Sequence, residues 1–334
     1  MTRHRSSAGI LLTAGTLLTG ALAAATPASA APAPDAPATH AVPSAERQSA
    51  AGFWTADRMR GATPFERLVR PAEVQKLKAP KPGGKTTTIA PTPAAGGAAT
   101  AGAVQPMAFP QSGGAWTGGG AVVKTSGRVF FTFQGRTASC SGNAVTSQNQ
   151  STVITAGHCV KYQGSWHTNW VFVPAYDNGK APYGQWTASK TLTTPQWQAS
   201  EDINYDVGAA VVAPLNGQKL TAVTGAQGIQ FNGGYNKAMY AFGFPAASPY
   251  DGSKLIYCSG NSSKDFLFSQ DHSLGCNMTG GSSGGPWFTG FSESAGTGLQ
   301  VSVNSFGYTF LPNRMFGPYF GNEAQAVYNQ AQSS

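Results

Sequence analysis

From about residue 116 onward, the chain consists of short apolar runs separated by Gly, Asn, Ser and Pro. The runs are rich in Val, Ile, Phe and Thr, which are typical of β-strands, and the separating residues are typical of turns. No helical periodicity of useful length appears before residues 322–331, where we expect one short helix. Many short strands within about 220 residues predict a β-sandwich or β-barrels. The expected strands are Val122-Val123 and residues 128–133, 151–155, 170–173, 207–212, 238–242, 254–257 and 299–303.

Residues 1–30 have the features of a signal peptide. Arg3 and Arg5 give a basic start, residues 9–25 are apolar and uncharged, and Ala28-Ser29-Ala30 is a small-residue cleavage site. Because a processing site bounds the apolar run, we expect cleavage rather than a membrane anchor. The mature protein is therefore predicted to be secreted, extracellular and without stable membrane association.

Residues 31–108 differ in composition from the rest of the chain. Ala and Pro dominate at both ends of this stretch, and such a composition buries too little apolar surface to offset the entropy of the chain. We therefore expect a largely flexible segment. Within it, residues 52–60 carry Trp54 and Met59 at helical spacing and are expected to form one short docking helix, with a plain exposed linker as the alternative.

The formal net charge of +8 invites a nucleic-acid partner, but the distribution of the charge argues against one. Arg3 and Arg5 leave with the signal peptide, and residues 31–108 hold nine Lys/Arg against five Asp/Glu. The basic excess thus lies mostly in segments that we expect to be removed. No nucleic-acid partner is predicted.

The four cysteines, Cys140, Cys159, Cys258 and Cys276, fit an oxidising exterior. They allow three pairings, and the sequence alone cannot choose between them. Their spacing favours Cys140 with Cys159 and Cys258 with Cys276, since these pairs close loops of similar, modest length. A metal site is not expected, because no cysteine pair has close ligand spacing.

Two segments carry the residue types of nucleophilic catalysis. Residues 280–287 read Gly-Gly-Ser-Ser-Gly-Gly-Pro-Trp, a turn in which a serine stands clear of its neighbours while backbone N–H groups point at a developing negative charge. Residues 155–159 read Thr-Ala-Gly-His-Cys and place a histidine at the end of an apolar strand. A serine hydroxyl is a weak nucleophile at neutral pH, so it needs a base such as this histidine.

In the order His then Ser, these segments resemble the catalytic motifs of the chymotrypsin-like serine proteases, over roughly residues 116–320. The resemblance implies that His158 is the general base and Ser283 the nucleophile. It also implies that the N–H groups of Gly281 and Ser283 form the oxyanion hole. Ser282 is the main competitor as nucleophile, but the following Gly-Gly-Pro aligns Ser283 with the family's Gly-Asp-Ser-Gly-Gly-Pro.

The third catalytic group is expected to be a carboxylate. Residues 205–212, Tyr-Asp-Val-Gly-Ala-Ala-Val-Val, resemble the family's Asp-Ile-Ala-Leu-Leu, in which an aspartate directly precedes a buried strand. This implies that Asp206 orients His158 and stabilises its charged form. Asp202 is a real alternative, although no apolar strand follows it directly.

The resemblance also selects among the possible β folds. It implies an all-β protein of two packed six-stranded antiparallel β-barrels, with the active site in the cleft between them and a short C-terminal helix. The protease domain is expected over residues 109–334, with barrel one at about 116–213 and barrel two at about 214–320. Cys140-Ser141-Gly142 resembles the family strand that is bridged to the cysteine beside the catalytic histidine. Residues 31–108 look like the prosegment of secreted actinobacterial trypsin-like peptidases.

The substrate-binding residues are less well defined. Ser305-Phe306-Gly307 resembles the family's Ser-Trp-Gly, whose strand pairs with the extended substrate, although Phe306 is equally a candidate for the core. Asn277 occupies the position of the aspartate of trypsin. Residues 276–281 are close to those of the bacterial glutamyl endopeptidases, yet Asn304 stands where those enzymes typically have a histidine. Specificity for Lys/Arg or for Glu therefore lacks its usual charged partner, and the preferred side chain stays open.

The function implied is that of a secreted serine endopeptidase acting on protein or peptide substrates, without a cofactor and as a monomer. A catalytically silent binding module on the same fold and an esterase with the same triad are the alternatives. Ser282 replaces the aspartate that pairs with the freed amino terminus in the animal enzymes. We therefore expect latency to come from the prosegment covering the cleft, with Trp54 and Met59 as apolar anchors. The mature chain is expected to begin between about residues 100 and 118, in a cleavable stretch.

Overall fold

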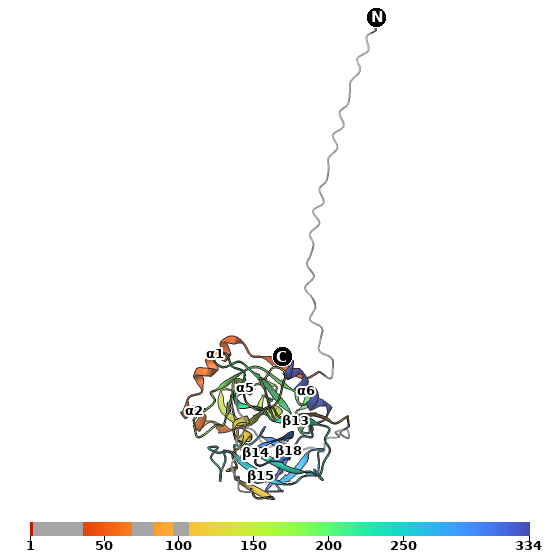
Figure 1. Ribbon diagram of the computed structural model, residues 1–334. Coiled ribbons are helices and arrows are strands. Elements are labelled where there is room, and N and C mark those ends of the chain that lie inside the picture. The colour runs from red at the N-terminus through yellow and green to blue at the C-terminus, as the bar shows by residue number, and fades with distance from the viewer. Residues whose placement is uncertain (3–35, 69–82, 96–106) are drawn as a thin grey trace. The chain divides into compact units, whose positions relative to one another are not determined.

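A computed structural model describes residues 1–2, 36–68, 83–95 and 107–334, and Pro34–Ser334 form one compact unit (Figure 1). The predicted signal peptide lies outside the described residues, apart from Met1 and Thr2. Within the described part of the chain, no helix is both long enough and apolar enough to cross a membrane.

Six antiparallel strands close into a barrel in the first half of the compact unit, because β11 pairs with both β10 and β12. On β5, Val129, Phe131 and Phe133 point into the barrel core, whereas Phe130 lies in a separate outer cluster. This is the period of two expected of a strand whose two faces are both covered. The strands in barrel order are β5 (Ser126–Phe133), β6 (Arg136–Ala144), β7 (Thr152–Thr155), β12 (Gly208–Val212), β11 (Trp186–Thr193) and β10 (Thr168–Pro174).

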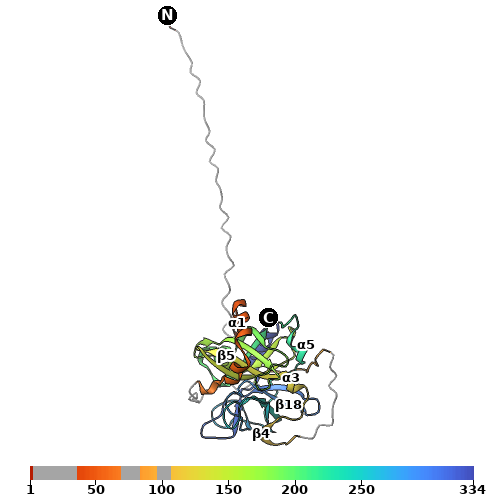
Figure 2. The same cartoon turned by 90° about the vertical axis from the view of Figure 1, so that its left-hand side faces the viewer.

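The second half is built from a seven-stranded and a three-stranded sheet. Figure 2 shows β4 and β18 in this half, below the barrel that contains β5. The seven strands in order are β3 (Thr87–Ile89), β13 (Gly228–Phe231), β19 (Thr297–Val303), β18 (Pro286–Ser292), β14 (Ala238–Gly243), β15 (Ile256–Asn261) and β4 (Gln111–Ala115). The three-stranded sheet contains β16 (Ser263–Lys264), β17 (His272–Gly275) and β20 (Arg314–Gly317).

The C-terminal helix α6 (Asn322–Gln332) packs against the first barrel, although it follows the second half in sequence (Figure 1). Its buried residues, Ala324, Val327, Tyr328 and Ala331, recur at the spacing of one helix face and belong to the core of the first barrel. The predicted all-β class, the six-stranded antiparallel barrel and the short C-terminal helix are thus confirmed.

The short remaining elements are α3 (Ala121–Thr125), α4 (Pro195–Ser200), α5 (Leu220–Thr224), η2 (Gly157–Cys159), η3 (Ile203–Tyr205), β8 (Lys161–Tyr162) and β9 (Ser165–Trp166).

One predicted strand is wrong. Val122-Val123 lies in the helix α3, whereas the other seven predicted strands lie in or overlap β5, β7, β10, β12, β14, β15 and β19. Gly119 and Gly120 both adopt positive φ before α3, and the N–H of Val123 bonds to the carbonyl of Gly120. Two apolar residues after a glycine pair therefore continue a turn into a helix, and Val122 is buried there without strand pairing.

The expectation that residues 31–108 are largely flexible does not hold for the described part of that segment. It contains β1 (Ala38–Ala41), α1 (Ser44–Phe53), α2 (Ala56–Gly61), β2 (Thr63–Pro64), η1 (Phe65–Arg67) and β3. β1 adds to β11 and β2 adds to β6, so both extend the barrel sheet. Composition misses this because strand addition uses backbone groups and needs few apolar side chains.

The single helix predicted over residues 52–60 is instead two helices that break between Phe53 and Ala56. Thr55 caps α2 through its side chain, which accepts a hydrogen bond from the N–H of Arg58 at 3.3 Å. Trp54, at the break, is 1% exposed and packs with Met59 in the outer cluster of the barrel. Its indole Nε1 donates to the carbonyl of Asn169 at 2.7 Å. Burying the two side chains stabilises the docked helices by about 1.5–3 kcal/mol each.

Candidate active site

A cavity of about 530 Å³ is lined by residues from both halves of the compact unit. The structure brings together in its wall the predicted catalytic residues and all the predicted substrate-binding residues. These are His158, Asp206, Asn277, Ser283, Ser305, Phe306 and Gly307.

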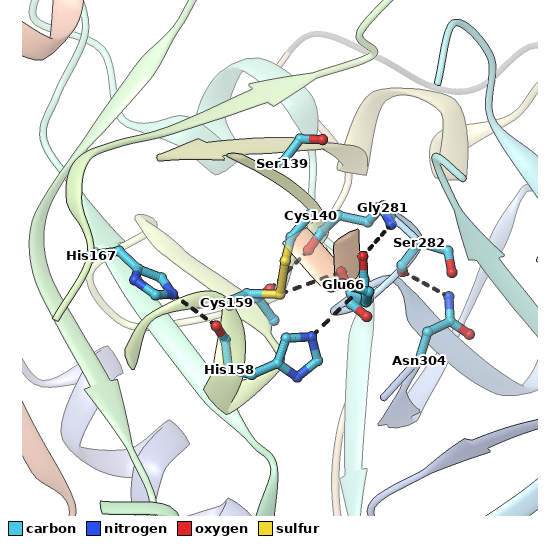
Figure 3. The surroundings of a disulfide bond; sticks show 12 residues. Glu66, Ser139, Cys140, His158, Cys159, His167, Gly281, Ser282 and Asn304 are labelled. Carbon is cyan, nitrogen blue, oxygen red and sulfur yellow. Dashed lines mark hydrogen bonds and ion pairs between the residues drawn. A yellow bond between two sulfur atoms is a disulfide. The ribbon is translucent and has the colours of Figure 1, made fainter. Parts of the chain in front are cut away.

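His158 is held rigidly at the edge of the first barrel. It lies in η2, directly after β7, and its neighbour Cys159 forms a disulfide with Cys140 on β6 (Figure 3). The ring of His167 donates from Nε2 to the carbonyl of His158 at 2.8 Å. His167 is buried, and burial lowers its pKa to about 3. It is therefore a neutral support for the backbone of His158.

Asp206 accepts hydrogen bonds from both the backbone and the ring of His158. Its Oδ1 accepts from the His158 N–H at 2.8 Å, and its Oδ2 lies 2.7 Å from His158 Nδ1. The hydroxyl of Ser305 donates to the same Oδ2 at 2.5 Å. Asp202, the sequence alternative, instead caps η3 by accepting from the N–H and the side-chain amide of Asn204. The geometry thus places Asp206, and not Asp202, against the imidazole.

The pKa of His158 is raised above its usual value near 6.5. Burial alone would lower this pKa, but the charge and hydrogen bond of Asp206 outweigh burial, with smaller contributions from the charges of Glu66 and Glu201. A positive imidazolium is therefore favoured while these carboxylates surround it.

The glycine-rich turn requires glycine at two of its positions. Gly281 and Gly284 have φ of +93° and +80°, a region that other residues rarely adopt. A Cβ on Gly284 would also lie 2.1 Å from Thr155 Oγ1 and 2.4 Å from the carbonyl oxygen of Ser141. The turn therefore packs directly on the strands that carry His158. Ser283 Oγ lies 3.5 Å from the carbonyl oxygen of Ser305, which is a long contact for a hydroxyl donor.

Glu66 reaches into this site from the segment preceding the barrel (Figure 3). Its Oε2 accepts from the N–H of Gly281 at 2.8 Å, and its Oε1 lies 3.9 Å from His158 Nε2. Phe65 stacks on the His158 ring with centroids 5.8 Å apart and planes 12° from parallel. Among the described residues, neither Glu66 Oε1 nor His158 Nε2 has a hydrogen-bond partner.

Sequence reasoning missed Glu66 because the residue carries no motif of its own. The contact with Gly281 spans 215 positions, and nothing local distinguishes this glutamate from the solvated ones. Only the expected docking of Trp54 and Met59, in the same segment, offered a signal, and it did not identify the carboxylate.

Two predicted substrate-binding side chains make internal contacts. Phe306 stacks on Phe316 with centroids 5.2 Å apart, and Asn277 Oδ1 accepts from the hydroxyl of Tyr250 at 2.6 Å. Asn304 is fully buried behind the turn and does not line the cavity. In the wall of the cavity, Gly307 is exposed and Phe306 is half-buried, and the side chain of Asn277 offers no charge to a substrate.

The disulfides link Cys140 to Cys159 and Cys258 to Cys276, the pairing that the spacing favours. Within the described ranges, Cys140, His158 and Cys159 place potential metal ligands close together. Both sulfur atoms are used in the disulfide, and a thiolate is the form that binds a metal. This donor set therefore does not fit a metal ion.

No family model matches the chain. A curated protein of Bacillus subtilis (strain 168), named extracellular metalloprotease, is 26% identical over 191 residues, which are 56% of this chain. The chain spans only 57% of the length of that relative.

Solved structures give closer matches. Protease Anisep from Arthrobacter nicotinovorans is 48% identical with a TM-score of 0.61, over 64% of this chain and 98% of that one. The thermostable serine protease AL20 from an extremophilic microorganism is 43% identical with a TM-score of 0.61, over 64% and 99%. A Glu endopeptidase, 15% identical with a TM-score of 0.53 over 67% and 98%, shares the fold. The chain therefore belongs to the bacterial chymotrypsin-like serine proteases.

Proposed function

We propose that the mature protein is a secreted endopeptidase that hydrolyses peptide bonds through His158, Asp206 and Ser283. The observation that carries the proposal is the double hydrogen bond from His158 to Asp206, beside a cavity that Ser283 also lines. Such a carboxylate fixes the tautomer of the imidazole, so that Nε2 is free to accept a proton.

The reaction follows from these positions. Ser283 Oγ attacks the carbonyl carbon of the scissile bond and gives its proton to His158 Nε2. The C–N bond breaks, the leaving amine takes that proton, and an acyl-enzyme remains on Ser283. Water, deprotonated by His158, then releases the acid and restores the serine. The N–H groups of Gly281 and Ser283 stabilise the oxyanion of each tetrahedral intermediate.

Two other functions use the same fold and are separated by experiment. A silent binding module would bind peptides without turnover, which the complete set of His158, Asp206 and Ser283 argues against. An esterase would hydrolyse activated esters but not amides of the same acyl group.

We further propose that residues 31 to about 108 form an inhibitory prosegment that covers this site. Trp54 and Met59 anchor the segment on the barrel, and Glu66 engages one oxyanion donor. The N–H of Gly281 binds the side-chain carboxylate of Glu66 and not a peptide carbonyl. The contact therefore blocks the site without presenting a scissile peptide bond to Ser283.

The nucleophile assignment predicts that Ser283→Ala in the mature enzyme lowers peptide turnover by on the order of 10⁴- to 10⁶-fold. Ser282→Ala, the matched control, is expected to keep most of the activity, since only Ser283 is aligned with the family motif. Steady-state kinetics with a peptide amide, alongside circular dichroism, makes the comparison. Substantial residual activity in Ser283→Ala, or a larger loss in Ser282→Ala, would assign the wrong serine.

The orienting role of Asp206 predicts that Asp206→Asn lowers kcat by about 10⁴-fold, because an amide stabilises the wrong tautomer of His158. Asp202→Asn is the control, and it is expected to change both kcat and stability little, because the amide oxygen of asparagine can still cap the turn. Kinetics and thermal unfolding of both variants test this. A reversed order of kcat would move the role to Asp202.

The contact of Glu66 predicts a lower pKa of His158 in the Glu66→Gln precursor, because one charge that favours the imidazolium is removed. Docking of the segment raises the pKa of His158. Docking is therefore strongest at a pH below the pKa of His158 in the undocked protein, and it weakens as the pH rises through the higher pKa of the docked protein. NMR titration of the His158 ring in Ser283→Ala precursors measures the shift. Asp57→Asn, which removes an exposed charge from the same segment, serves as control. An unchanged pKa in Glu66→Gln would contradict the contact.

The prosegment proposal also predicts where the mature chain begins. β4 starts at Gln111 and pairs with β15, so a start beyond that residue would remove a strand of the second half. We expect cleavage between about residues 100 and 110. Amino-terminal sequencing of active secreted enzyme reads the site directly, and a start at Ala31 in fully active protein would rule out prosegment control.

A further inference from the structure

The orientation of an N–H group in the oxyanion hole is set by the carbonyl on the other side of its peptide plane. In a trans peptide the carbonyl and the N–H point in opposite directions. The N–H of Gly281 is thus fixed through the carbonyl of Gly280, which accepts from the N–H of Ala246 at 2.7 Å. The N–H of Ser283 is fixed through the carbonyl of Ser282.

The carbonyl of Ser282 has a side-chain donor as well as a backbone donor. It accepts from the N–H of Gly285 at 3.0 Å and from Asn304 Nδ2 at 3.0 Å (Figure 3). Gly285 belongs to the same turn, so its bond moves with the turn. Asn304 instead follows β19, and its amide is anchored outside the turn.

Every polar atom in the side chain of Asn304 is engaged. Nδ2 also donates to the carbonyl of Phe242 on β14 at 2.8 Å, and Oδ1 accepts from Trp287 Nε1 at 2.7 Å. Asn304 and Trp287 are both fully buried. The amide therefore cannot flip without leaving the indole donor unsatisfied and turning its own oxygen towards two carbonyl oxygens, which is costly in a buried site.

We propose that Asn304 is a positioning residue for the reaction, holding the Ser282 carbonyl inward so that the Ser283 N–H points at the developing oxyanion. The inference rests on the proposed endopeptidase function. Within the described residues, the N–H of Ser283 has no hydrogen-bond acceptor, so it is available to a substrate, whereas the N–H of Gly281 binds Glu66. A donor that is already aimed requires no reorganisation as charge develops.

Loss of this role should lower the stabilisation of the transition state and leave the affinity for substrate unchanged. Asn304→Leu keeps the size of the side chain and removes the donor to the Ser282 carbonyl. We expect kcat in the mature enzyme to fall by on the order of 10²-fold, as for the loss of one oxyanion donor, with KM nearly unchanged.

The decisive readout compares two inhibitors of the same peptide sequence. Ser283 Oγ adds to the carbon of a peptide aldehyde and passes its proton to His158, which leaves a hemiacetal oxyanion for the N–H groups to hold. The corresponding peptide alcohol forms no such adduct. Asn304→Leu is expected to weaken the aldehyde by the same factor as kcat and to leave the alcohol within about twofold of wild type.

The matched control is Gln227→Leu, which removes another fully buried and fully bonded amide away from the cavity. It is expected to lower stability without changing kcat or aldehyde affinity. Active-site titration corrects both variants for unfolded protein. If Asn304→Leu does not fold, Trp287→Phe removes the indole bond that orients Asn304, together with part of a buried ring, and it should give a smaller loss in the same two quantities.

The proposal is overturned if Asn304→Leu or Trp287→Phe keeps wild-type kcat and aldehyde affinity after titration, or if aldehyde and alcohol weaken equally. A wild-type enzyme that neither cleaves peptides nor binds the aldehyde would instead refute the endopeptidase function itself.

Discussion

The catalytic geometry depends on the contact between Ser141 on β6 and the glycine-rich turn. The N–H of Ser141 donates to the carbonyl of Ser283 at 2.7 Å, and its hydroxyl donates to the carbonyl of Gly281 at 2.9 Å. The same hydroxyl accepts from the N–H of Phe244 at 2.9 Å. Because Cys140, beside Ser141, is bonded to Cys159, beside His158, one strand holds both the proposed base and the turn that carries the proposed nucleophile.

This contact holds the glycine-rich turn and His158 in place while the segment that carries Glu66 is still attached. Ser282 occupies the position of the aspartate that forms an ion pair with the freed amino terminus in the animal enzymes. This turn is therefore shaped without that ion pair. Ser141, Asn304 and Ala246 hold the carbonyls of the turn from behind. If the prosegment acts as proposed, activation consists of removing Glu66 and Phe65 from a finished site rather than of building one.

Local motifs carried most of what the sequence could predict. His158, Asp206 and Ser283 each sit at the end of a buried strand or in a tight turn, where a few neighbouring residues dictate the conformation. The longer strands were also predictable, since their apolar residues occupy covered faces. Val122-Val123 failed because two residues are too few for a period of two to compete with the preceding glycine turn.

Contacts between distant segments were not predictable. The docking of β1 and β2 uses backbone groups, and Glu66 contacts Gly281 although 215 positions separate the two residues in sequence. The role of Asn304 also lies outside sequence reasoning. The sequence marked it as a departure from a substrate-reading histidine, whereas its amide faces the back of the turn. The direction of this side chain is fixed by its hydrogen bond from Trp287, a residue 17 positions away, which no local pattern encodes.

Covalent labelling tests the central claim most directly. A fluorophosphonate reacts with an activated serine by losing fluoride and forming a serine–phosphorus bond, and peptide mapping by mass spectrometry identifies the residue. Mature enzyme should carry one adduct, on Ser283, whereas the uncleaved precursor should label far more slowly because Glu66 and Phe65 cover the site. An adduct on Ser282, no adduct in the mature enzyme, or equal labelling of precursor and mature protein would contradict a prosegment-covered Ser283 nucleophile.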